Sequence, residues 1–361
     1  MFVSALRVLG LLIFMSVTAT GQVVLPHRYD GPEVIGDGGP YVVPIYINQN
    51  DFSPSRYTIY ARVGSGAMLP YLFDTGAQQL TSVIGGQSGL ATDCFSFASG
   101  TSYCYYPLNS TITLGYKSGY NVVMSRPMNY GAVAQIGNQA TTGAALADGT
   151  YGDFGAGFYG SGTMSSVLSN ITLRSGLLPG WIVDVAGQTN VTNGQGTLTI
   201  GLTQQMIDNA KNNPASIVMP MSTSGVLIPG PTSVPGPNGL IPGANTAQVS
   251  NTIVTISKAG KTVSQILPTV FDTGGGPNAV VYDPNYIDVD GGKLTISYNG
   301  KTIVSYDGVT PWGGKVVAMS PTIGWPRANP GGATIYQNFV VMFALAATQN
   351  SGGQVILIPK Q

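Results

Sequence analysis

Charged side chains are scarce in this chain. Only 8% of its 361 residues are Asp, Glu, Lys or Arg, and 15 basic residues balance 15 acidic ones. Such a chain lacks the basic surface that neutralises a phosphate backbone or attaches a protein to an anionic membrane. We therefore do not expect nucleic acid as a partner.

Histidine and glutamate are almost absent, since His27 and Glu33 are the only ones. A Ser-His or Cys-His hydrolase needs an imidazole within hydrogen-bond reach of its nucleophile, and His27 lies in a peripheral segment where a solvated position is expected. With two cysteines and one histidine, no metal site is expected, and no glycine-rich nucleotide loop suggests another cofactor. Carboxylate chemistry must therefore come from aspartates.

The chain also lacks an apolar run long enough to span a membrane as a helix, which needs about 20 residues. Residues 1–21 contain Arg7, an apolar stretch at 8–17 and then small residues, a pattern typical of a cleaved secretory signal peptide. An uncleaved membrane anchor is the alternative. We expect an exported protein, secreted or periplasmic, without a stable membrane anchor.

The two cysteines, Cys94 and Cys104, lie close together in one apparent loop. An exported protein rarely keeps reactive free thiols, so a disulfide between them is favoured, and two free thiols are the alternative.

What the chain has in abundance is 50 glycines, 24 prolines and 19 tyrosines, which describes many short strands joined by turns. We expect an all-β fold with a few short helices. The length favours two lobes. After the signal peptide we assign 22–50 to an N-terminal extension, either a strand or a short propeptide, 51–220 to an N-terminal lobe and 221–361 to a C-terminal lobe. The Pro- and Gly-dense segment 226–245 is interpreted as a surface loop near the lobe junction.

One element occurs twice. Phe-Asp-Thr-Gly-Ala stands at residues 73–77 and Phe-Asp-Thr-Gly-Gly at 271–275. Each copy follows a strand and a glycine turn, at 57–64 in the first and 253–260 in the second, which indicates an internal duplication. Each aspartate ends an apolar run, where a strand delivers the carboxylate into a turn formed by Gly76 or Gly274.

Two such turns facing each other would bring Asp74 and Asp272 together. Two adjacent carboxylates cannot both ionise cheaply, so one stays a general acid and the other becomes a general base. Thr75 and Thr273 can each donate a hydroxyl to the backbone of the other lobe and lock the pair. The alternative is that both are ordinary turn aspartates.

On these motifs the sequence resembles the pepsin-like aspartic endopeptidases. The similarity continues in order along most of the chain, through a glycine-flanked apolar element at 152–158, a helical segment at 164–170, a strand at 181–185, a hairpin at 196–201 before the lobe junction, a helix followed by a strand at 332–343, and a closing strand at 355–358. The resemblance implies a bilobal fold of two related β lobes with a cleft between them. It also implies hydrolysis of peptide bonds of extended polypeptides by a water molecule that Asp74 and Asp272 activate.

Two features depart from that family. Ala77 and Gly275 stand where a serine or threonine usually follows Asp-Thr-Gly and donates to the outer carboxylate oxygen. The loss of two donors predicts that the apparent pKa values of the pair are raised. The tyrosine of the family's flap is also not obvious. Tyr116, in a glycine-flanked hairpin, is our candidate over Tyr120.

Three functions remain open at this point. The first is an aspartic endopeptidase that works as a monomer on polypeptide substrates without a cofactor. The second is a catalytically silent binding or inhibitor protein on the same fold, although such proteins typically lose an aspartate and this chain keeps both. The third is a β-rich structural protein whose two motifs are only turns.

Overall fold

The computed structural model describes residues 39–47, 56–77, 79–87, 89–97, 101–115, 120–157, 166–185, 195–221, 248–321, 326–345 and 353–360. The expected signal peptide, most of the 22–50 extension, the segment 226–245 and Tyr116 lie outside these residues. No helix within the described ranges is both long and apolar enough to cross a membrane.

The described part is mostly β, which confirms the expected fold class. Its strands form one sheet of 16 strands and one of seven. The helices are short: α1 (Gln204–Asn212), α2 (Gly332–Asn338) and the 3-10 turns η1 (Leu168–Asn170) and η4 (Pro284–Val289). The expected helix at 164–170 is described only from residue 166, and there it is the single turn η1.

The larger sheet contains strands from both ends of the sequence. They are β1 (Tyr41–Ile47), β2 (Tyr57–Val63), β3 (Met68–Asp74), β4 (Leu80–Ser82), β5 (Asp93–Ser96), β6 (Ser102–Ser110), β7 (Ile112–Leu114), β8 (Val123–Met124), β9 (Met128–Ile136), β10 (Gln139–Ala140), β11 (Gly152–Gly155), β12 (Leu178–Val185), β13 (Gln195–Leu202), β14 (Ile217–Pro220), β22 (Phe339–Ala344) and β23 (Gln354–Pro359).

The smaller sheet is built from the second half of the chain. Its strands are β15 (Gln248–Lys258), β16 (Lys261–Val270), β17 (Ala279–Tyr282), β18 (Lys293–Tyr298), β19 (Lys301–Asp307), β20 (Val316–Met319) and β21 (Arg327–Asn329).

The duplication inferred from the sequence is visible in the strand order. The larger sheet contains the run β2-β3-β11-β4-β9 and the smaller one the run β15-β16-β21-β17-β20. The successive pairings are antiparallel, parallel, antiparallel and parallel in both runs. Each run begins with a hairpin whose turn contains a glycine in the left-handed region, Gly64 or Gly260.

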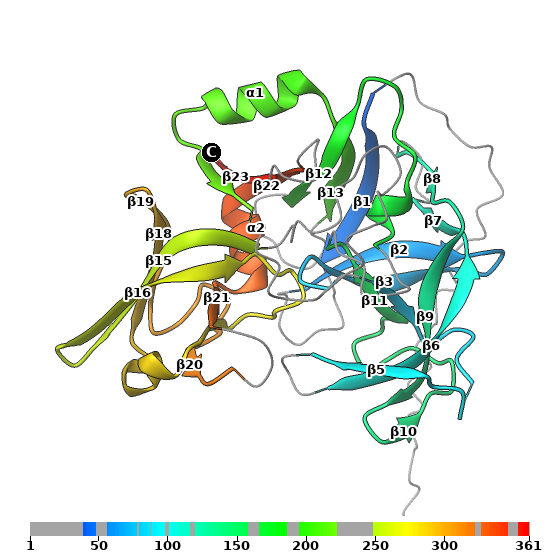
Figure 1. The fold of residues 1–361 in the computed structure, drawn as a ribbon, viewed down its shortest axis with the longest axis horizontal. Helices are drawn as coiled ribbons and strands as arrows, with labels where there is room; N and C mark the ends of the chain where they lie inside the picture. The colour runs from blue at the N-terminus through cyan, green and yellow to red at the C-terminus, as the bar shows by residue number, and fades with distance from the viewer. Residues whose placement is uncertain are drawn as a thin grey trace, which may run out of the picture.

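The two runs lie on opposite sides of a central group of strands, β12, β13, β22 and β23 (Figure 1). β22 pairs with β12, and β23 pairs with β14, so the end of the chain completes the larger sheet. β1, from the 22–50 segment, pairs with β13 and β2. One continuous hydrophobic core contains buried side chains of both runs, including Phe73 and Phe271, and joins them into one body.

Candidate active site

The two aspartates occupy matching places at the ends of matching strands. β3 ends at Asp74, and β16 ends two residues before Asp272. Parallel strand β11 runs beside β3 with Gly155 opposite Asp74. Beneath Asp74 the rings of Phe73 and Phe154 stack with centroids 6.1 Å apart, which fixes these two strands against each other.

Thr75 and Thr273 tie the two loops together by a reciprocal exchange of hydrogen bonds. The backbone N–H of Thr75 donates to Thr273 Oγ1 at 2.9 Å, and that of Thr273 donates to Thr75 Oγ1 at 3.0 Å. Each hydroxyl then donates to a carbonyl across the junction, Thr75 to Phe271 at 2.6 Å and Thr273 to Phe73 at 2.5 Å. Both threonines are buried, so these bonds form away from water.

Gly76 and Gly274 let the loops approach closely. A Cβ on Gly76 would lie 2.5 Å from Asp272 Cγ, and one on Gly274 would lie 2.2 Å from Asp74 Oδ2. Any side chain at either position would therefore collide with the opposite carboxyl group. The sequence argument assigned these glycines to turn formation, whereas the structure shows that they face the opposite aspartate.

The loops bring the two carboxyl groups close enough to interact electrostatically. Asp74 Oδ1 accepts the backbone N–H groups of Gly76 at 2.7 Å and Ala77 at 3.0 Å, and Asp272 Oδ1 accepts that of Gly274 at 2.8 Å. Asp74 is buried, whereas Asp272 is partly exposed. Burial, followed by the negative charge of Asp272, raises the pKa of Asp74 well above its usual range. The arrangement can hold one proton and one negative charge.

Asn329, which the sequence argument missed, donates its side-chain amide to Asp272 Oδ2 at 3.2 Å. Asp272 therefore has a side-chain donor although residue 275 is glycine. On the other side, Ala77 contributes only its backbone N–H to Asp74. Burial is the largest cause of the raised pKa of Asp74, and an effect of the missing hydroxyls on the pair stays a prediction.

Asp153, on β11, is a third carboxyl group near the pair. It is 2% exposed, and neither of its carboxylate oxygens has a hydrogen-bond partner within the part of the chain that the structure describes. Burial raises its pKa, the charge of Asp272 raises it further, and Arg56 opposes the shift while Asp148 adds to it. The family resemblance indicated an apolar element at 152–158 and did not predict a buried acid there.

Tyr336, on α2, supports the threonine exchange from below. Its hydroxyl donates to the carbonyl of Phe271 at 2.9 Å and lies 3.0 Å from Thr75 Oγ1. Burial raises the pKa of this phenol, which therefore remains a neutral donor. The sequence predicted the helix but no role for this side chain.

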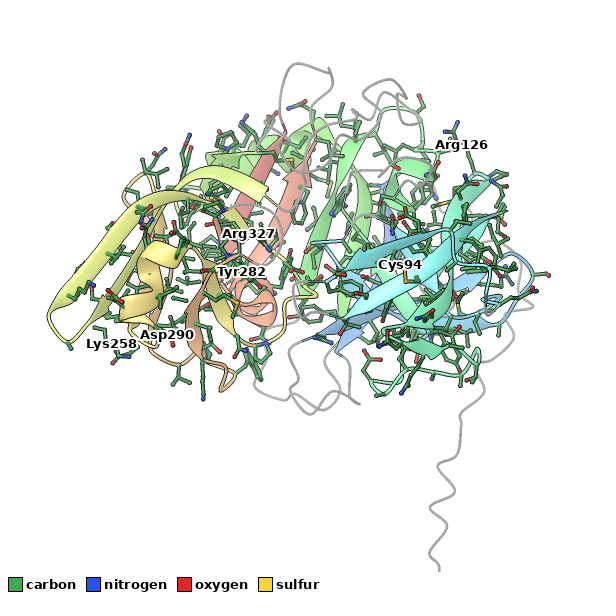
Figure 2. All side chains as sticks on the ribbon, turned by 60° about the horizontal axis from the view of Figure 1, so that its bottom comes forward. Cys94, Arg126, Lys258, Tyr282, Asp290 and Arg327 are labelled. Carbon is green, nitrogen blue, oxygen red and sulfur yellow. A yellow bond between two sulfur atoms is a disulfide. The ribbon has the colours of Figure 1, made fainter. Side chains whose placement is uncertain are left out.

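Tyr116, the flap candidate, lies outside the described residues, and Tyr120 stands beside Asn121, whose backbone N–H donates to the carbonyl of Val42 on β1 at 2.9 Å. The hairpin β5–β6 reaches toward the smaller sheet in both views (Figures 1 and 2). Its Tyr103 lies close enough to Asp153 for that carboxylate to contribute to the raised pKa of the phenol, after burial.

The expected disulfide is confirmed and lies in this hairpin. Cys94 on β5 and Cys104 on β6 are directly opposite each other, with Cα atoms 4.1 Å apart (Figure 2). Beside the disulfide, the rings of Phe95, Phe97 and Tyr103 pack edge to face with centroids 4.7–5.7 Å apart. The disulfide and the packed rings together stabilise the hairpin.

On the other side of the pair, the guanidinium of Arg327 stacks over the ring of Tyr282 at 4.2 Å from its centroid (Figure 2). Both side chains interact electrostatically with Asp272. A partly buried cation near Asp272 offsets part of the cost of a negative charge there.

Comparison with known proteins reveals the fold. No family model and no curated protein matches this sequence. Among solved structures, aspartic proteinase from Irpex lacteus matches with a TM-score of 0.51 and 16% identity over 89% of this chain and 98% of that one. Basic 7S globulin from soybean matches with a TM-score of 0.52 and 12% identity over 89% and 97% of the two chains. The protein described as edgp gives 0.52 and 11% over 90% and 96%. The chain therefore has the fold of the pepsin-like aspartic proteinases.

Proposed function

We propose that the protein is an aspartic endopeptidase that hydrolyses peptide bonds of extended polypeptides, with a water molecule activated by Asp74 and Asp272. The observation that carries the proposal is the meeting of the two carboxyl groups across a symmetrical junction. Reciprocal threonine bonds and two side-chain-free glycines hold them there. Ordinary turn aspartates would need neither device, which argues against a purely structural role for the motifs.

We assign a role to each carboxyl group from its surroundings. Asp74, with its raised pKa, keeps the shared proton, and the partly exposed Asp272 is the base. Asp272 takes a proton from water as the water oxygen attacks the peptide carbonyl carbon, and Asp74 gives its proton to the carbonyl oxygen. The tetrahedral diol then collapses: Asp272 protonates the amide nitrogen, one hydroxyl returns a proton to Asp74, and the C–N bond breaks.

The wider setting is part of the same proposal. We place Asp74 in an N-terminal lobe and Asp272 in a C-terminal lobe, with the boundary between residues 205 and 245. The disulfide fits an extracellular location. We propose that residues 1–21 direct export, and that the mature chain acts as a monomer without a cofactor.

A binding or inhibitor protein on the same fold is the second candidate. Asp153 favours it, because a third buried carboxyl group beside the pair adds to the cost of the charge that the base must carry. The solved structures of similar fold include one named as a proteinase and one named as a globulin. At their low identity they support the fold and leave the choice between the two functions to experiment.

Digestion of an unfolded protein substrate, from strongly acidic to neutral pH, decides between these functions. We expect cleavage that a transition-state-analogue inhibitor of aspartic peptidases blocks. Asp74→Asn and Asp272→Asn should each abolish cleavage with the fold retained, because either change destroys the shared-proton pair but preserves its shape. Asp307→Asn, at an exposed position on β19, is the matched control and should cleave normally.

Two outcomes would contradict the proposal. Binding of the peptide-like inhibitor without any cleavage at any pH would identify a binding protein. Substantial cleavage by either Asn variant would show that the two aspartates do not act as a pair.

A further inference from the structure

The strand beside each aspartate carries a polar side chain at the same place in both repeats. On β11, Asp153 lies opposite Leu72, two residues before Asp74. On β21, Ala328 lies opposite Thr269, so the next residue, Asn329, reaches the level two residues before Asp272. The duplicated fold thus places one polar side chain at the same level of the strand beside each aspartate.

Asn329 is held in a single orientation. Its Oδ1 accepts the backbone N–H of Gly331 at 3.0 Å, which leaves its Nδ2 facing Asp272 Oδ2 at 3.2 Å. The side chain is 7% exposed, so water competes little for the amide. Because the acceptor side of the amide is already engaged, the group facing the carboxylate is the donor.

Gly275 makes room for this amide. A Cβ at residue 275 would lie 2.4 Å from Asn329 Nδ2 and 3.3 Å from its Cγ. A serine or threonine directly after Asp-Thr-Gly would therefore displace the Asn329 amide from its place beside Asp272. The amide of Asn329 thus takes the place of the hydroxyl that residue 275 lacks.

We propose that Asn329 is the positioning residue for Asp272: its side-chain amide, in place of a hydroxyl in the loop, holds the outer oxygen of the carboxylate, and Gly275 is glycine to admit it. The inference rests on the proposed peptidase function, since it assigns a support to the base of that reaction. On the Asp74 side, the matching position holds Asp153, which has no amide N–H to donate.

Loss of the amide should move the pH dependence of the pair. A donor to a carboxylate favours its charged form, so removing it shifts the acidic limb of the pH-rate profile to higher pH. The other groups that act on the charge of Asp272 stay the same in every variant of residue 329. They come from several elements, and they are Asp74, Asp153, Tyr282, Arg327 and Tyr336.

The first experiment removes the amide in two ways. Asn329→Ala should lower kcat by about 10-fold to 100-fold, as expected for a hydrogen bond to a charged group, with little change in KM and an upward shift of the acidic limb. Asn329→Asp has the same shape and keeps an acceptor for Gly331 N–H, so it guards against misfolding of the alanine variant. It should show a similar loss wherever residue 329 is ionised.

The second experiment moves the donor back to the loop. Gly275→Ser alone should impair activity, because its Cβ displaces the amide. The double variant Gly275→Ser with Asn329→Ala relieves the collision and supplies a hydroxyl, so it should be more active than either single variant and recover the acidic limb. A role for Asn329 in folding alone would not produce this rescue.

The inference is overturned if Asn329→Ala keeps the wild-type kcat and acidic limb, or if the double variant is no better than Asn329→Ala. Neither result would affect the peptidase proposal, which depends on cleavage by the wild type. If the wild type does not cleave, ¹³C NMR titration of the aspartate carboxyl groups tests the inference by itself. Titration of the pair at higher pH in Asn329→Ala supports it, and superimposable curves overturn it.

Discussion

Thr75 and Thr273 make matching hydrogen bonds, but losing the hydroxyl of one would not leave the same backbone groups unpaired as losing the hydroxyl of the other. The carbonyl of Phe271 accepts from Thr75 and also from the hydroxyl of Tyr336. The side-chain bond to the carbonyl of Phe73, in contrast, comes from Thr273. Replacement by valine keeps the shape of threonine and removes the hydroxyl, so Thr75→Val and Thr273→Val isolate this difference.

A buried polar group left without a partner costs about 1–3 kcal/mol. Thr75→Val leaves the N–H of Thr273 unpaired while Tyr336 still serves Phe271, so we expect a loss of about 1–3 kcal/mol. Thr273→Val leaves the N–H of Thr75 unpaired and also removes the bond to Phe73, so we expect about 2–5 kcal/mol. The second loss is a large share of the roughly 5–15 kcal/mol by which proteins are usually stable.

Chemical denaturation of the two valine variants, with Thr75→Ser and Thr273→Ser as controls that keep the hydroxyl, measures these costs. Peptide cleavage should fall together with stability in the valine variants, because the junction that aligns the carboxyl groups is loosened. Equal stability of the Val and Ser variants at both positions would show that the hydroxyls do not hold the junction. Equal losses at the two positions would refute the role given to Tyr336.

Two further predictions concern the surroundings of the pair. Because the folded state favours the neutral acid at Asp153, its contribution to stability is fully present below the ordinary carboxyl pKa and is lost as pH rises toward the raised folded value. Asp153→Asn should therefore match the wild type in strong acid and exceed it by about 1–3 kcal/mol at neutral pH, as measured by denaturation across that range, and a constant difference at all pH values would contradict this reasoning. Replacing Cys94 and Cys104 by serine should cost at most about 3 kcal/mol, because the disulfide closes a short loop, and a loss much larger than that would mean that the hairpin supports the core.

The repeat could be predicted from the sequence because it depends on local pattern. Each Asp-Thr-Gly follows a hairpin of alternating residues with a glycine turn, and these features determine the strand that delivers the carboxyl group. The disulfide was predictable for a similar reason, since only one pairing of two cysteines exists.

The contacts that the sequence did not reveal come from strands far away in the chain. Asn329 lies 57 residues from Asp272, and its place beside the carboxylate depends on the parallel pairing of β16 with β21. The only available signal was Gly275, read as the loss of a donor rather than as space for one. The burial of Asp153 was also not evident from the sequence, because its neighbours made the segment look like a buried apolar strand.

The two repeats therefore support their aspartates differently, although the two loops make nearly the same hydrogen bonds. The threonine exchange and the facing glycines treat Asp74 and Asp272 alike. The neighbouring strands do not, because β21 offers an amide donor, whereas β11 offers a carboxyl group that has no hydrogen-bond partner among the described residues. A donor favours the charged form of a carboxyl group and a nearby acid opposes it, so under the proposed mechanism we expect the negative charge on Asp272 and the proton on Asp74. In that proposal the acid and the base are distinguished by one residue on each adjacent strand, outside the motif that brings the two aspartates together.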